Sequence, residues 1–218
     1  MSPTEIFTSI FADVGDKKEL LIWPGEGSFE VVVGAILVQN TAWKNVEKAL
    51  ANLKSRNLIG IDEILSISIN ELAELIKPSG FYNTKAKRLN GLCRAIKSEF
   101  NDFENFKSNV SREWLLSVKG VGAETCDAIL AYACDRAVMV VDNYAIRILT
   151  ALGYEFECYD EAQEWLSGVD FDGIYKILPN ASEAEIFRIF HALVLEFCKR
   201  YSKGKSISEQ GLKILGVN

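Results

Sequence analysis

The chain has 218 residues, of which 49% are apolar and 25% are charged. This composition excludes a disordered or collagen-like chain, and the length suffices for one large domain or two small ones. A net charge of −6 argues against a strongly basic protein that coats nucleic acid, although it says little about one local binding face. No apolar run reaches the roughly 18 residues of a membrane span, and the first residues lack a basic signal-peptide region, so we expect a cytoplasmic protein without membrane attachment.

Helical periodicity dominates the chain. The first apolar run, Phe29 to Val38, is ambiguous, because its β-branched residues suit a buried strand and its length also suits a buried helix. Apolar residues then recur at i, i+3, i+4 and i+7, both from Cys126 and from Ile186, which predicts helices in those segments. Basic residues cluster at 85–97 and at 199–205, and each cluster is either a solvated helix face or part of a binding face.

Two short helical patterns between Ser111 and Leu130 are joined by Lys119-Gly120-Val121-Gly122. Their length matches a helix-hairpin-helix. Both glycines permit positive φ and a close approach of the backbone to a ligand, and the N–H groups that open the second helix favour a phosphate oxygen. An acidic protein could hold a DNA backbone in this way, and the alternative is an ordinary tight turn between helices.

Asp142 ends an apolar run over residues 138–141 and precedes a helical pattern that starts at Ala145. The spacing predicts that Asp142 begins a helix. An N-cap is the commonest use of such an aspartate. Helix N–H groups also favour the ionised carboxylate that electrostatic catalysis requires, so both roles can hold together.

The cysteine and histidine content limits metal and disulfide chemistry. Five cysteines are widely spaced and form no C-x-x-C pair, so neither a disulfide framework nor a cysteine metal site is expected. His191 is the only histidine, which argues against a histidine-based metal site, and we expect it to pack between helices.

These motifs resemble the helix-hairpin-helix DNA glycosylases of the endonuclease III superfamily, and the resemblance covers nearly the whole chain. Within that family the chain is most similar to the bacterial 3-methyladenine DNA glycosylases of the cluster-free type. The segments that carry the likeness are Trp23-Pro24, 34–43, 78–87, the hairpin with Val140-Val141-Asp142, and 190–199.

The resemblance implies an all-α, two-domain fold with the active site in the interdomain cleft. One domain would comprise residues 21–136, with the helix-hairpin-helix at 111–134. The other would combine residues 1–20 with 137–218. The run from Phe29 to Val38 would then be a buried helix.

The resemblance also implies roles for single residues. Asp142 matches the catalytic aspartate, which stabilises the positive charge that develops on the sugar. Trp23, Pro24, Trp43 and Lys199 match the base pocket, in which the tryptophans sandwich a flipped base; the alternatives are core packing for the tryptophans and a helix C-terminal cation for Lys199. The residues that match DNA contacts are Gln39, which fills the vacated duplex space, Phe81, an intercalating wedge or else a buried aromatic, and Lys119, Gly120, Val121, Gly122 and Ala123 of the hairpin.

Two departures from relatives bear on the chemistry. Bifunctional relatives carry a lysine in the second hairpin helix for a Schiff base, and Glu124 stands at the matching position. Cluster-binding relatives use four cysteines near the C-terminus, whereas Cys198 is the only cysteine after residue 160, so we expect no iron-sulfur cluster and no other metal. A monovalent cation at the hairpin carbonyls, which relatives suggest, is left open.

The implied function is removal of alkylated purines, chiefly 3-methyladenine, from damaged double-stranded DNA in base excision repair. The enzyme would be monofunctional, a monomer, and associated with the nucleoid during repair. The alternatives are a bifunctional glycosylase/AP lyase acting on oxidised or mismatched bases, a noncatalytic helix-hairpin-helix DNA-binding module, and a helical protein-interaction domain that binds no nucleic acid.

Overall fold

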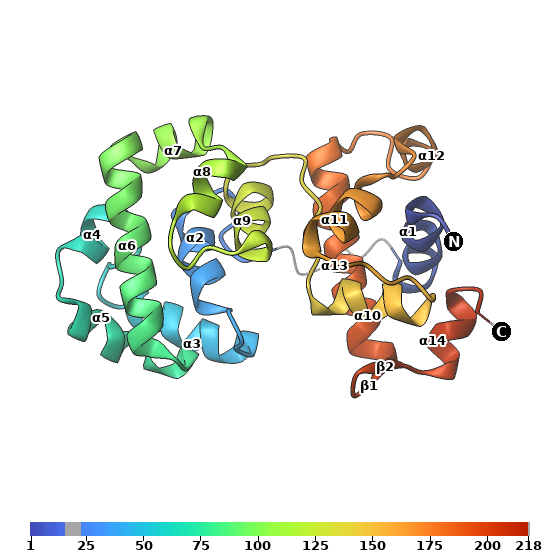
Figure 1. Cartoon of the computed structure of the whole chain (residues 1–218), viewed down its shortest axis with the longest axis horizontal. Coiled ribbons are helices and arrows are strands. Elements are labelled where there is room, and N and C mark those ends of the chain that lie inside the picture. Colours follow the sequence, from blue (N-terminus) through green and yellow to red (C-terminus); the bar gives the residue numbers. More distant parts are fainter. Residues whose placement is uncertain (16–22, 218) are drawn as a thin grey trace. The chain divides into compact units, whose positions relative to one another are not determined.

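The computed structural model describes residues 1–15 and 23–217, which form two compact units (Figure 1). We call residues 23–134 the central unit, and residues 1–15 with 135–217 the terminal unit. The predicted all-α fold is confirmed, since the only strands in the described residues are the antiparallel pair β1 (Ser202–Lys203) and β2 (Ser206–Ile207). No helix among these residues is long and apolar enough to span a bilayer.

The central unit is built around the buried helix α2 (Phe29–Leu37). Its other elements are α3 (Trp43–Lys54), α4 (Ile61–Leu65), α5 (Ile69–Leu75), the 3₁₀ turn η1 (Lys77–Ser79), α6 (Tyr82–Phe100), α7 (Phe103–Asn109), α8 (Arg112–Ser117), α9 (Ala123–Ala128) and the π-helical turn η2 (Ile129–Ala133). Every residue of α2 except Glu30 is buried, so the ambiguous run is a helix that is apolar on all sides. Helices α4 and α5 pack against α6 (Figure 1).

The terminal unit joins the first helix to the C-terminal half of the chain. Its helices are α1 (Pro3–Val14), α10 (Asn143–Ala151), α11 (Tyr159–Ser167), α12 (Phe171–Tyr175), α13 (Glu183–Tyr201) and α14 (Glu209–Ile214). Helix α13 includes the periodic pattern that starts at Ile186, and it packs against α1 and α10. Phe7 and Phe190 meet edge to face in this core, with ring centroids 5.4 Å apart.

Candidate active site

Asp142 is the N-cap of α10, as its position in the sequence predicts. Its backbone is extended, with φ −92° and ψ −177°, and its Oδ1 accepts hydrogen bonds from the backbone N–H groups of Tyr144 and Ala145, both at 2.9 Å. The other oxygen, Oδ2, lies 3.6 Å from Nε2 of His191 on α13. One carboxylate oxygen therefore caps the helix, and the second faces an imidazole.

The electrostatics keep this carboxylate ionised. Burial raises the pKa of Asp142, but the His191 imidazole and the two N–H groups outweigh that effect, so the pKa lies below its usual value. The side chain is only 18% exposed. A partly buried carboxylate that stays charged at neutral pH can stabilise a developing cation.

Aromatic rings pack around Trp23, the first residue of the central unit. Trp23 and Trp43 meet edge to face, with centroids 5.4 Å apart and planes at 82°, and Trp23 also contacts Tyr132 at 5.5 Å. Gly34 of α2 permits this arrangement, because a Cβ there would lie 3.1 Å from Nε1 of Trp23. In this geometry the two tryptophan rings contact each other directly and leave no space for a base between them.

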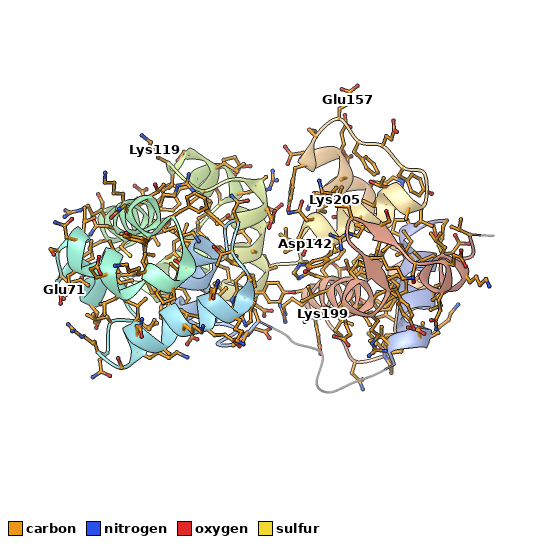
Figure 2. All side chains as sticks on the ribbon, turned by 90° about the horizontal axis from the view of Figure 1, so that it is seen from below. Glu71, Lys119, Asp142, Glu157, Lys199 and Lys205 are labelled. Atoms are coloured by element: carbon orange, nitrogen blue, oxygen red, sulfur yellow. The ribbon has the colours of Figure 1, made fainter. Side chains whose placement is uncertain are left out.

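Only one of the two glycines in the hairpin between α8 and α9 has positive φ. Gly120 has φ +95°, which glycine adopts most easily, as expected. Gly122 does not use the positive φ that its residue type permits: its φ is −93°, because it is the extended N-cap of α9. A Cβ at Gly122 would meet nothing within 4 Å, so a ligand can still approach the backbone there. Val121 is buried, whereas Lys119 extends outward into solvent (Figure 2).

Gln39 lies against this hairpin. Its Nε2 donates to the carbonyl oxygen of Gly120 at 3.0 Å and to Oγ1 of Thr125 at 3.1 Å, and its Oε1 accepts from Nη1 of Arg88 at 2.5 Å. The amide is thus held by polar contacts on both sides. This network joins the α2–α3 connection, α6 and the hairpin within the central unit.

The other residues that match family site positions are exposed. Phe81 is 72% exposed, which excludes the alternative of a buried aromatic. Pro24 is also exposed, and Lys199 is exposed in the last turn of α13 (Figure 2). A lysine in the last turn of a helix complements the helix dipole.

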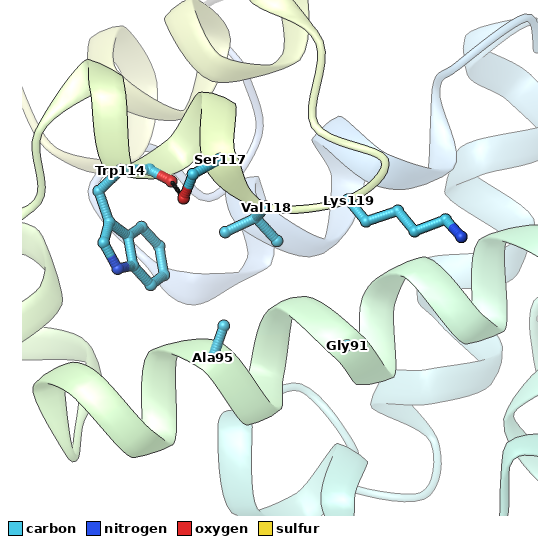
Figure 3. Close-up of a pocket in the computed structure, with 6 residues that line it drawn as sticks. All are labelled: Gly91, Ala95, Trp114, Ser117, Val118 and Lys119. Atoms are coloured by element: carbon cyan, nitrogen blue, oxygen red, sulfur yellow. Dashed lines mark hydrogen bonds between the residues drawn. The ribbon is translucent and has the colours of Figure 1, made fainter.

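A groove of about 340 Å³ lies beside the hairpin (Figure 3). Its lining residues are Gly91 and Ala95 of α6, and Trp114, Ser117, Val118 and Lys119 of α8 and the turn. Only Lys119 belongs to the residues that the sequence singled out. The groove therefore borders the candidate DNA-binding turn without containing the base-pocket residues.

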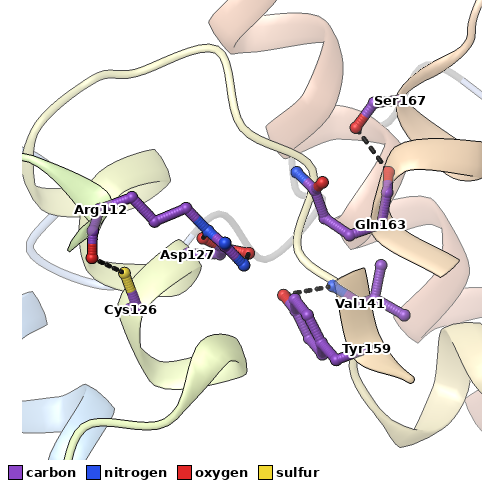
Figure 4. A network of polar contacts seen from close by, with 7 residues as sticks. All are labelled: Arg112, Cys126, Asp127, Val141, Tyr159, Gln163 and Ser167. Atoms are coloured by element: carbon purple, nitrogen blue, oxygen red, sulfur yellow. Dashed lines mark hydrogen bonds and ion pairs between the residues drawn. The ribbon is translucent and has the colours of Figure 1, made fainter. Parts of the chain in front are cut away.

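Sequence reasoning missed several polar contacts that lie near the candidate residues within each unit. Arg112 at the start of α8 forms a bidentate ion pair with the fully buried Asp127 of α9, at 2.8 and 3.2 Å (Figure 4). In the terminal unit, the Tyr159 hydroxyl accepts from the N–H of Val141, next to Asp142 (Figure 4). Lys85 is also buried. Its spacing from Leu89 and Leu92 places it on the apolar face of α6, a signal that could have found it.

We expect Gly120→Ala to lower the free energy of unfolding by about 2 kcal/mol, because φ is unfavourable for alanine and its Cβ would lie 2.5 Å from Cγ of Arg88. Gly91→Ala is the matched control. Gly91 lies within α6 with open space around it, so alanine should stabilise the protein by about 0.5–1 kcal/mol. Denaturant titration measures both values. A change in the free energy of unfolding in the same direction for both variants would contradict the prediction.

Comparisons with known proteins identify the family. A family model described as "HhH-GPD superfamily base excision DNA repair protein" matches residues 33–164, more than half of the chain. The chain belongs to this superfamily. At that level it is a helix-hairpin-helix DNA glycosylase, a hydrolase of N-glycosidic bonds.

Individual relatives agree with this assignment. The chain is 42% identical over 194 residues to a protein of Methanocaldococcus jannaschii named as a candidate DNA repair glycosylase, covering 86% of this chain and 84% of the relative. It is 40% identical to the solved 3-methyladenine DNA glycosylase of H. pylori bound to 1,N6-ethenoadenine, with a TM-score of 0.82 over 92% of this chain and 98% of that one. An endonuclease III–DNA complex shares the fold, with a TM-score of 0.72 at 19% identity and 98% coverage of both chains.

Proposed function

We propose that this HhH-GPD protein is a monofunctional glycosylase that removes alkylated purines, chiefly 3-methyladenine, from duplex DNA. The observation that carries the proposal is the ionised, helix-capping carboxylate of Asp142. The 40% identity to the H. pylori 3-methyladenine DNA glycosylase supports the substrate class.

The chemistry needs little more than this carboxylate. Cleavage of the glycosidic bond leaves positive charge on the sugar, and a carboxylate close to that carbon stabilises it and can orient the attacking water. An alkylated purine is already a good leaving group, so no strong acid is required. Glu124 supplies no amine for a Schiff base, which favours hydrolysis that leaves the strand intact.

Binding of the damaged duplex would use the central unit. The backbone at Gly122 and Ala123 opens α9 with N–H groups that suit a phosphate oxygen. Trp23 and Trp43, which are partly exposed, offer apolar surface on which an extruded purine can stack, and the buried Tyr132 packs against Trp23. The proposal includes no iron-sulfur cluster, because one cysteine after residue 160 cannot supply four thiolate ligands.

The test is release of free bases from methylated duplex DNA, resolved by chromatography. We expect the protein to release 3-methyladenine and to leave the strand unbroken, with no adduct trapped by borohydride. Absence of any released base contradicts the proposal. A trapped adduct or a nicked strand would instead favour the bifunctional alternative, and substrates with oxidised bases would then be tried.

We expect His191→Leu to move the acid limb of the pH–rate profile to higher pH. His191 contributes to the lowered pKa of Asp142, and activity is lost as the pH falls through that pKa, so its removal makes the loss begin earlier. Cys198→Ala is a control on the same helix. Burial raises the pKa of Cys198 to about 11, so this thiol, which packs near Tyr144, is neutral. Its removal should leave the pKa of Asp142 unchanged. Identical acid limbs in the wild type and His191→Leu would contradict this.

A further inference from the structure

A buried lysine links two connections of the central unit. Lys85 of α6 is only 2% exposed, and its Nζ donates to the carbonyl oxygens of Leu37 at 2.6 Å and Ser79 at 2.7 Å, and to Oγ1 of Thr41 at 2.7 Å. An ammonium has three N–H donors, so these contacts satisfy it. Burial and the nearby Arg88 lower its pKa to about 8. Lysine is rarely buried so fully, which indicates a specific task.

The three acceptors come from the two segments that carry Gln39 and Phe81. Leu37, the last residue of α2, and Thr41, in the connection to α3, lie two residues on either side of Gln39, and Ser79 lies two residues before Phe81. The hydroxyl of Thr41 also donates to the carbonyl oxygen of Ser79, so the segments are tied to each other as well. The Lys85 ammonium thereby holds both the segment that carries Gln39 and the segment that carries Phe81.

The segment that Lys85 holds is strained. Phe81 has φ +45° and ψ +29°, a left-handed conformation that is unfavourable for an aromatic residue, and Gly80 before it has φ +68°. Phe81 is nonetheless 72% exposed, so packing of its ring does not compensate for the strain of this backbone conformation. Strained residues persist where their surroundings over-determine them, and they cluster at functional sites.

We propose that Lys85 is a positioning residue for DNA binding: it clamps the Gln39 and Phe81 segments so that both side chains are presented to the duplex in a fixed relation. The inference rests on the proposed function. The same helix contributes twice, because Arg88, one turn after Lys85, holds the Gln39 side chain itself. The clamp should speed base release from duplex DNA, where the base must leave the stack. It should have little effect on release from single strands, where the base is already unpaired.

The experiment compares single-turnover base release from methylated duplex DNA and from the same DNA denatured to single strands. We expect Lys85→Met to slow release from the duplex by about tenfold or more, and from single strands by less than about threefold. When Lys85→Met is combined with Phe81→Ala, release from the duplex should slow by less than about twofold further, since both substitutions remove the same positioned Phe81 side chain. Lys97→Met is the control, because Lys97 lies on the same helix in an exposed pair with Asp62.

The outcomes separate this inference from the proposed function. If the wild type releases no base from either DNA, the proposed function fails. If the wild type is active and Lys85→Met slows both substrates equally, or adds its full effect to Phe81→Ala, the positioning role is wrong. If Lys85→Met does not fold, Thr41→Val removes one acceptor while keeping the side-chain shape. It should lower the duplex-to-single-strand ratio in the same direction, and an unchanged ratio would overturn the proposal.

Discussion

Asp142→Asn should lower the rate of base release by about a hundredfold to a thousandfold while the protein stays folded. The amide carries no charge to oppose the positive charge on the sugar. Its oxygen can still accept from the N–H groups of Tyr144 and Ala145, so the cap of α10 is retained. Single-turnover release of 3-methyladenine measures the rate, and denaturant titration measures the stability.

Asp142→Ala separates the two roles of the side chain. This variant loses the carboxylate and the cap together, so its free energy of unfolding should fall by about 1 kcal/mol, whereas Asp142→Asn should stay close to the wild type. Both variants should be inactive. Wild-type rates in Asp142→Asn would mean that Asp142 only caps the helix, which would remove the main support for the proposed reaction.

Asp127→Ala should lower the free energy of unfolding by about 3 kcal/mol. Asp127 is fully buried on α9, and its bidentate pair with Arg112 joins the two helices of the hairpin (Figure 4). Removal of one partner leaves the other charge poorly compensated. Arg112 is 30% exposed and can partly reach water, which places the value at the low end of the range for buried pairs.

An exposed ion pair of the same unit provides the comparison. Arg56 and Glu71 lie 3.0 Å apart with side chains 57% and 45% exposed, so Glu71→Ala should cost less than about 1 kcal/mol. Denaturant titration of both variants tests the difference. Equal losses would show that burial does not strengthen the pair in the hairpin.

The residues that sequence reasoning placed well are those defined by local spacing. The patterns from Cys126 and Ile186 are helical, and Asp142 begins α10, because periodicity and capping depend on a few neighbouring residues. The run from Phe29 to Val38 needed more than its own pattern. Its β-branched residues form a helix because the surrounding helices bury it on every side.

Details of backbone and ring geometry were less accessible. The turn sequence allowed positive φ at both glycines of the hairpin, but only Gly120 adopts it, since Gly122 starts α9 in an extended conformation. The two tryptophans were singled out from the sequence, yet their edge-to-face contact depends on Gly34 of α2 and on Tyr132 of η2. Such orientations are set by tertiary packing, which here includes a partner as far away in the chain as Tyr132.

The sequence alone thus determined the helices, the hairpin and the aspartate at a helix start, because each is specified within one or two turns. The tertiary structure decided which polar groups are buried and what compensates them. Lys85 finds two of its acceptors 44 and 48 residues earlier, and Arg112 finds its carboxylate across the hairpin, on the next helix. A buried charge is stable only where the fold supplies such partners, and their distance along the chain hides them from any local pattern.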